Sequence, residues 1–393
     1  MAFLAGSLGF DRFQVNGESP KEFTQEHLDT LESLSSGKFE STSEETTQVG
    51  FLGGQHLFDQ TFDLNKNVIH GALHAAVRID TNQIPSAIRK AWMQMELNAL
   101  TAENPERRPT KSQRQEAKDA VEARCEMEVK SGKYHRMAQF PILWDAQSGI
   151  FYFGGSSPSA CTHAADLMER GFGIELERIT VGKIAQNWAT RNKKIEALES
   201  ISPAIFHPSH PGCEAHWSNA DSRLPDYLGN EFLMWLWHNT ETESDTITLK
   251  DGSEVTAMFA KNLVLECPLG ESGKESISSE IPTKLPEAVE AIRSGKMPRK
   301  AGLVLVRFGQ QYDLTLQAES FSISGAKLQA DKEAQGVELL ESRIDAIRTL
   351  NETVDLLFEA FCELRVSKEW EKRLENISQW IAPNKTSKKR GAA

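Results

Sequence analysis

Apolar residues recur along this chain with both the two-residue period of strands and the three-to-four-residue period of helices. Helices are expected after Ser19, Pro85, Thr110 and Ser157, where a capping residue or a first-turn proline precedes an apolar stripe. Strands are expected at 8–15, 68–79, 140–144, 150–153, 174–181, 246–250, 255–260, 263–267, 303–308, 312–316 and 321–328. Hairpins and helices are mixed, which predicts an α+β fold with mixed or antiparallel sheets and packed helices.

The C-terminal part has a different pattern. One long helix is predicted from Asp331 to about Leu364, with a heptad-like seam at Val337, Leu340, Ile344, Ile347, Asn351, Val354, Phe358 and Phe361. This helix either pairs with its copy in a second subunit or folds back on its own domain. The second interpretation is favoured because further leucines widen the apolar stripe beyond a two-helix seam.

These patterns predict four regions. An N-terminal α+β domain covers 1–182, with a helical and hairpin tip at about 105–145. A helix and a proline- and histidine-rich linker cover 183–228. A C-terminal α+β domain with a basic loop covers 229–330 and includes the aromatic stretch Glu231–Trp237, which is expected in the core. The long helix and a short, disordered basic tail complete the chain at 331–393.

The composition is that of an ordinary soluble globular protein, with 25% charged and 39% hydrophobic residues among 393. The net charge of −12 requires any nucleic-acid site to be a segregated basic patch on an acidic body. Five scattered cysteines without a CxxC pair indicate a reducing cytosol. No signal peptide is indicated, and no apolar run approaches the ~18 residues that a membrane span needs.

Two basic clusters are candidates for binding phosphate. The first lies between a helix expected at Pro286–Gly295 and the strand that begins near Leu303, and a cationic loop held between two rigid elements suits phosphate at a fixed place. On charge alone, a solvated basic turn is the favoured interpretation, because runs of like charge are usually just solvated. The members of this set are Arg293, Lys296, Arg299, Lys300, Arg307 and Lys327. The second set, Lys111, Arg114 and Lys118, lies on the helix expected after Thr110.

The linker carries potential metal ligands at steps of three residues: His207, His210, Cys213 and His216. Imidazoles and a thiolate can close a tetrahedral zinc site, but this spacing matches no common zinc motif, so ordinary loop histidines are favoured. His70 and His74 are expected to share one face of the 68–79 strand, where a structural role is favoured over metal binding. No phosphate-loop, nucleotide-binding or nucleophile motif occurs in a suitable setting, so no catalytic residue is nominated.

Several short strings, taken in order, resemble the RdgC family of bacterial recombination-associated proteins. They are Val49–Leu52 before the strand that ends at Arg78, the helix at Pro85, the basic segment 111–119, the Trp144–Ile150 hairpin, the 292–296 and 301–308 segments, and the closing Leu314, Phe321 and Lys327-Leu328. The resemblance covers about residues 1–182 and 229–330. This chain is longer, because the 201–228 linker and the segment after Ala330 depart from shorter family members.

The resemblance implies a non-enzymatic protein without cofactors that binds double-stranded DNA with little sequence preference. Two horseshoe-shaped subunits would form a homodimeric ring with a positively lined hole, and DNA occupancy would limit filament formation by a recombinase without stable contact. The location would be cytoplasmic and nucleoid-associated. The family's basic-aromatic tip corresponds here to a turn that lacks its proline, with Lys133, Tyr134 and Arg136 as candidates for the dimer interface. A metal-dependent nucleic-acid enzyme that uses the linker histidines, or a scaffold that uses the long helix, remain the alternatives.

Overall fold

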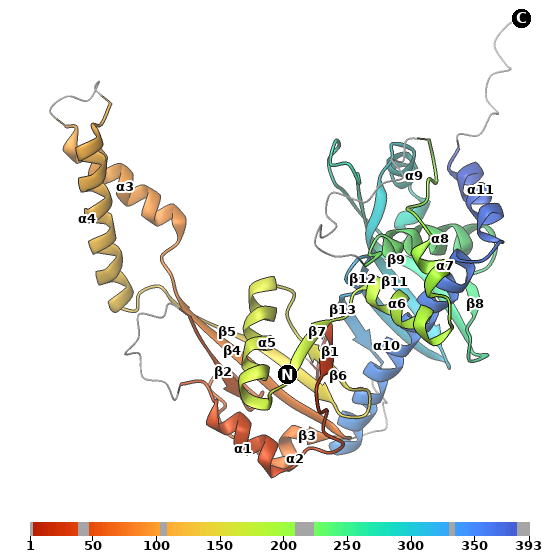
Figure 1. Ribbon diagram of the computed structural model, residues 1–393, viewed down its shortest axis with the longest axis horizontal. Coiled ribbons are helices and arrows are strands. Elements are labelled where there is room, and N and C mark those ends of the chain that lie inside the picture. Colours follow the sequence, from red (N-terminus) through yellow and green to blue (C-terminus); the bar gives the residue numbers. More distant parts are fainter. Residues whose placement is uncertain (1–2, 38–46, 103–107, 209–223, 330–334, 383–393) are drawn as a thin grey trace, which may run out of the picture.

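The chain forms an open U in the computed structural model, which describes residues 3–37, 47–102, 108–208, 224–329 and 335–382 (Figure 1). One side of the U is a pair of helices, α3 (Ser86–Leu100) and α4 (Lys111–Lys130). The other side is the C-terminal part, where α8 (Leu228–Thr242), α9 (Pro286–Arg293) and α11 (Trp370–Ile381) surround strands. Helices and antiparallel strands are mixed along the chain, so the α+β prediction is confirmed.

A single antiparallel sheet runs through the U, and β1 (Leu8–Asn16) joins its two parts. On one side of β1 lie β6 (Ile150–Phe153), β5 (His135–Asp145), β4 (Ala72–Asn82) and β2 (Thr47–Leu52). On the other side lie β13 (Ile323–Leu328), β12 (Gln310–Gln317), β11 (Met297–Arg307), β9 (Glu254–Glu266) and β10 (Glu275–Ser279). The short strands β3 (Val68–Ile69), β7 (Glu175–Arg178) and β8 (Thr246–Thr248) pair with β4, β1 and β9.

Two helices pack against the N-terminal part of the sheet. In the N-terminal part, α1 (Gln25–Ser33) and α5 (Pro158–Phe172) contribute Leu28, Leu31 and Leu167 to a core with Phe51, Val77 and other strand residues. The remaining short helices are α2 (Leu64–Asn67), α6 (Val181–Arg191), α7 (Ile195–Glu199) and the 3₁₀ turn η1 (Pro282–Lys284).

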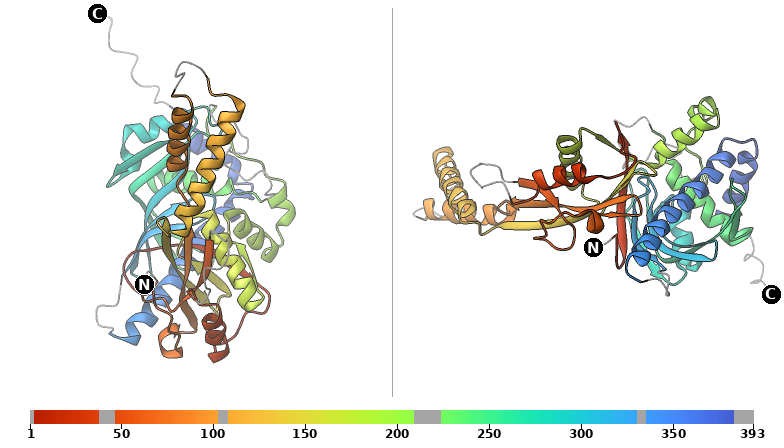
Figure 2. Two further views of the ribbon diagram at one scale, coloured as in Figure 1. Left: turned by 90° about the vertical axis from the view of Figure 1, so that its left-hand side faces the viewer. Right: turned by 90° about the horizontal axis from the view of Figure 1, so that it is seen from below.

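The pair formed by α3 and α4 has its own small core around Trp92, Val121 and Cys125 and projects from the body (Figure 2).

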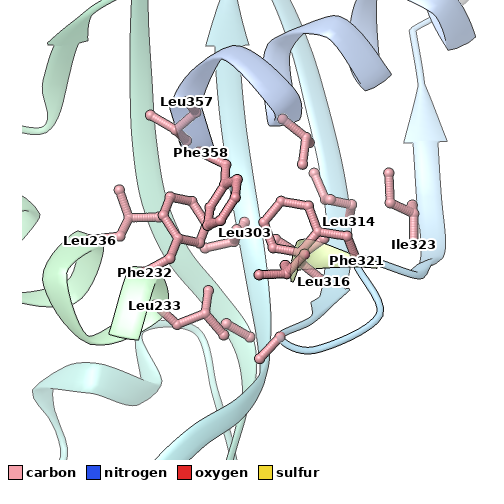
Figure 3. Close-up of a cluster of buried hydrophobic side chains, with 14 of the residues drawn as sticks. Phe232, Leu233, Leu236, Leu303, Leu314, Leu316, Phe321, Ile323, Leu357 and Phe358 are labelled. Atoms are coloured by element: carbon pink, nitrogen blue, oxygen red, sulfur yellow. The ribbon is translucent and has the colours of Figure 1, made fainter. Parts of the chain in front are cut away.

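The largest core lies between the C-terminal part of the sheet and two helices. Figure 3 shows aromatic and aliphatic side chains from α8, from strands β11 to β13 and from α10 (Val337–Arg365) packed against one another. Phe232 contacts Phe321 and Phe358 at ring-centroid distances of 5.7 and 5.6 Å. Trp235 and Trp237 are 5% and 0% exposed, so the prediction that this aromatic stretch is buried is confirmed. Leu8 and Phe10 belong to the same core, so the predicted N- and C-terminal domains share a sheet and a core.

Helix α10 connects the two parts of the molecule. Its seam residues Ile344, Ile347, Val354 and Phe358 are buried within their own chain, as the favoured sequence interpretation expected. Arg12 of β1 donates two hydrogen bonds of 2.8 Å to Asp355. The seam is therefore occupied internally from Ile344 to Phe361, whereas Val337 at its start is 64% exposed.

Some expected elements have different limits. Residues 68–79 do not form one strand, because His70 and Gly71 adopt positive φ angles of 50° and 74° and turn the chain back from β3 into β4. This two-residue turn matches the twist of a hairpin. His70 therefore lies in a turn while His74 is buried in β4, and the two do not share a strand face.

Three further predictions need correction. The first helix begins at Gln25 after a capping box of Thr24 and His27, and not after Ser19. The 255–260 and 263–267 strands are one strand, β9, and the polar segment after it contains β10. The basic loop of the C-terminal domain is not a loop, because β11 begins at Met297 and pairs with β9.

Candidate nucleic-acid interface

The cations of the first predicted cluster are dispersed along β11 and its neighbours. Lys296 precedes this strand and Arg307 is its last residue. A strand rises ~3.3 Å per residue, so these two positions lie roughly 35 Å apart. The first cluster is therefore not the compact basic loop that was predicted. Its cations form an extended row, and their side chains have different neighbours.

Lys296 and Arg299 are neutralised within the chain. The side chain of Lys296 is 8% exposed, and its ammonium group pairs with Glu275 of β10. Arg299 donates from Nη1 to Glu266 at 2.8 Å and from Nε to Glu319 at 3.0 Å. Burial opposes the charge of Arg299, but the two carboxylates outweigh it and raise the pKa of the guanidinium. A cation that is already paired and partly buried gains little by meeting a phosphate.

Arg307 and Arg293 also have internal partners. Arg307 is 2% exposed, and its guanidinium contacts Asp251 at 2.5 Å and Glu352 at 3.0 Å. It holds the β8–β9 turn against α10. Arg293 donates from Nε to the carbonyl oxygen of Ile381 at 2.7 Å and so anchors α11. These two residues stabilise the fold and are not presented for a phosphate contact.

Lys300 and Lys327 remain exposed on the C-terminal part of the sheet. Neither forms an ion pair with another residue in the described ranges. Their surroundings differ. Lys327 lies opposite Asp313 in the strand register, and the Asp313 carboxylate accepts a hydrogen bond from Lys261. These contacts lower the pKa of Asp313, first through the hydrogen bond from Lys261. Lys300 is thus the member of the first cluster whose charge is least compensated.

The three cations of the second cluster lie on one helix, as predicted. Lys111, Arg114 and Lys118 are all exposed and lie three and four residues apart on α4. The helix is positioned by a capping box, in which the Thr110 hydroxyl accepts from the N–H of Gln113 at 3.3 Å. Spacings of three and four residues place side chains on one helix face. Within the described part of the chain none of the three forms an ion pair.

The predicted interface residues lie at the base of the helical pair. The turn that contains Lys133 joins α4 to β5, whereas the far end of the pair is the α3–α4 connection (Figure 1). Lys133 pairs with Glu128 at 3.1 Å, and Tyr134 packs against the small core around Trp92. The expected tip-like turn is thus a junction, while Arg136 is exposed on β5. Their role in a dimer stays a prediction.

The predicted metal ligands are mostly outside the described residues. His210, Cys213 and His216 fall in the 209–223 gap, and only His207, which is half-buried, is described. Across the described ranges, no three histidine, cysteine, aspartate or glutamate side chains gather as a metal site. The four cysteines in those ranges, Cys125, Cys161, Cys267 and Cys362, are free thiols.

Sequence reasoning did not identify two cations of the sheet, Arg178 at the junction of its two parts and Lys261 in the C-terminal part. Arg178 of β7 donates to Asp11 of β1 at 2.6 Å and keeps 38% of its side chain exposed. Lys261 sits at a positive φ of 68° within β9 and pairs with Asp313. A non-glycine residue in this conformation is uncommon. No local sequence signal marks either side chain, since each partner lies on a different strand.

Comparison with known proteins does not assign a family: no family model matches the chain, and no curated protein shows significant similarity. Among the described helices, none is both long enough and apolar enough to span a bilayer.

Proposed function

We propose that this protein binds double-stranded DNA through phosphate contacts and with little sequence preference, as the resemblance to the RdgC family implies. In this proposal it acts without a cofactor or a catalytic step, as a ring-shaped homodimer in the nucleoid. Bound DNA is then withheld from a recombinase, which limits filament formation. The cations that make the contacts are Lys111, Arg114 and Lys118 of α4, with Lys300 and Lys327 of the sheet.

The observation that supports the proposal most directly is the cation row on α4. Three exposed cations on one helix face, none with an ion pair to a described residue, stand out in a chain with a net charge of −12. A solvated helix face is the simpler interpretation of such a row. However, an acidic protein that binds a polyanion needs its positive charge segregated, and here two surfaces provide it. The cations predicted earlier at Arg293, Lys296, Arg299 and Arg307 are removed from the proposed contact set because of their internal partners.

Replacing Lys111, Arg114 and Lys118 together with alanine is expected to weaken duplex binding on unrelated sequences to a similar extent. Each lost phosphate contact lowers the slope of log K against log salt by ~0.9, so the slope should fall by about two to three units. The measurement is a salt titration of binding with two duplexes of different sequence.

The matched control replaces Lys21, Lys368 and Lys372 with alanine, since these are also exposed lysines and have no ion pair with a described residue. The net charge changes by the same amount in both triple variants. Equal losses of affinity in the two variants would show that only the overall charge matters. An unchanged slope in the α4 variant would remove the helix from the DNA interface.

The native mass of the protein is expected to be that of two chains of 43.9 kDa. Adding a duplex of about three helical turns, each ~10 base pairs, should add the mass of one duplex for each pair of chains, because a ring encloses one DNA molecule. Native mass spectrometry measures both stoichiometries. A single chain on each duplex would contradict the ring.

A further inference from the structure

The junction of the two parts of the sheet contains a polar pocket of about 590 Å³. Its wall is formed by β1, the β6–α5 loop and the end of β7 on one side, and by β11, β12 and β13 on the other. In Figure 1, β1, β6, β7 and β13 lie where the base of the U meets its right-hand limb, and β12 and β11 continue into that limb. Three cations, Arg178, Arg299 and Lys300, line the pocket together with two carboxylates, Asp11 and Glu319.

Both carboxylates are already occupied by neighbouring donors. Asp11 is 1% exposed and accepts from Arg178 at 2.6 Å and from the hydroxyl of Ser322. Glu319 accepts from Arg299 at 3.0 Å and from the Asn230 amide at 2.9 Å. Arg299 also pairs with Glu266, which lies outside the pocket lining. These bonds hold both guanidinium groups in place.

Two cations on opposite walls of the pocket keep exposed side chains, Arg178, which is paired with Asp11, and Lys300. Arg178 comes from the N-terminal part of the sheet and keeps 38% of its side chain exposed. Lys300 comes from the C-terminal part, is exposed, and has no acidic partner among the described residues. The hydroxyl groups of Thr315, Ser320 and Ser324 supply further donors around them. Charged donors and hydroxyls converging on one concave site are the chemistry that recognises a phosphate group.

The geometry points to a phosphate-binding site in this pocket, held between Arg178 and Lys300. The site takes one phosphate group, either as a phosphodiester of a DNA duplex or as a free phosphate or nucleotide. If the phosphate belongs to a DNA duplex, the inference rests on the proposed function. The pocket then adds a central DNA contact between the two basic surfaces. A bound phosphate would also join the two parts of the sheet, since its partners come from both.

The test uses the full-length protein with inorganic phosphate, thymidine monophosphate and a DNA duplex as separate probes in isothermal titration calorimetry. Lys300→Ala is the informative variant because the lysine is exposed and has no ion pair within the described ranges, whereas loss of Arg178 would leave the buried Asp11 without its cation. Lys274→Ala is the matched control, an exposed lysine between β9 and β10 that does not line the pocket and is not among the proposed DNA contacts.

Inorganic phosphate is expected to bind the wild-type chain saturably, and Lys300→Ala should raise its dissociation constant about tenfold, the effect of one charge-assisted hydrogen bond. Lys274→Ala should leave phosphate binding unchanged. If the two variants behave alike, or if the wild-type chain binds neither phosphate nor nucleotide, the pocket is not a phosphate site.

The duplex probe separates this inference from the proposed function. Competition between phosphate and duplex, lost in Lys300→Ala, would identify the DNA backbone as the source of the phosphate. If the chain binds phosphate through Lys300 but binds no duplex, the inference of a phosphate site stands and the proposed function is refuted. Duplex binding that is unaffected by Lys300→Ala, with no phosphate binding, would refute the pocket alone.

Discussion

Replacing Arg365 with alanine is expected to lower the free energy of unfolding by about 3–5 kcal/mol. Arg365 of α10 donates to Glu231 of α8 at 2.6 Å, and the two side chains are only 6% and 3% exposed. The guanidinium also donates to the carbonyl oxygen of Ser202 and lies 4.7 Å from the ring centroid of Trp370. Alanine would leave a buried carboxylate without its charged partner. Urea denaturation followed by tryptophan fluorescence measures the loss.

Two further variants give this prediction its controls. Lys133→Ala breaks an exposed pair with Glu128 and should cost less than about 1 kcal/mol, since solvent screens such pairs. The double variant Glu231→Leu with Arg365→Met should recover much of the loss, because it removes both buried charges together. An Arg365→Ala variant as stable as Lys133→Ala would mean that Glu231 is readily solvated and that the pair does not lock α8 to α10.

Acidification from pH 6.5 to pH 4 is expected to remove about 3 kcal/mol of stability through His74. Burial lowers the pKa of this imidazole to about 4 from an ordinary value of 6.5, and the nearby Lys66 ammonium acts in the same direction. In that pH range the unfolded chain binds a proton that the folded chain does not. Stability therefore falls as the pH falls from 6.5, and the contribution is complete below about 4.

The variant His74→Gln isolates this contribution because glutamine does not titrate. Urea denaturation at several pH values should give a shallower dependence of the unfolding free energy on pH for the variant than for the wild-type chain. The slope is the informative quantity, since the substitution itself alters a buried site where the imidazole Nε2 has no hydrogen-bond partner among the described residues. Equal slopes would show that His74 becomes solvated before the rest of the chain unfolds.

The two basic clusters show why charge patterns predict a site only in part. Lys111, Arg114 and Lys118 are close in sequence and lie on a helix, so their shared exposed face follows from local periodicity. Arg307 is equally basic in sequence, but its partners Asp251 and Glu352 are 56 and 45 residues away. Whether a cation is free for a ligand depends on such distant carboxylates, which no local pattern reveals.

The sequence by itself determined the fold class, most of the helices and strands, the buried aromatic stretch of α8 and the cation row on α4. These features depend on side-chain period, capping residues and turn residues within a few positions, which act locally. Only the tertiary structure decided that one sheet continues from β13 into β1, that α10 joins both parts of it, and that Lys296, Arg299 and Arg307 are neutralised internally. Strand order and ion pairing join residues far apart in the chain, and a buried cation such as Lys296 or Arg307 is paired with a carboxylate that only the folded chain brings to it.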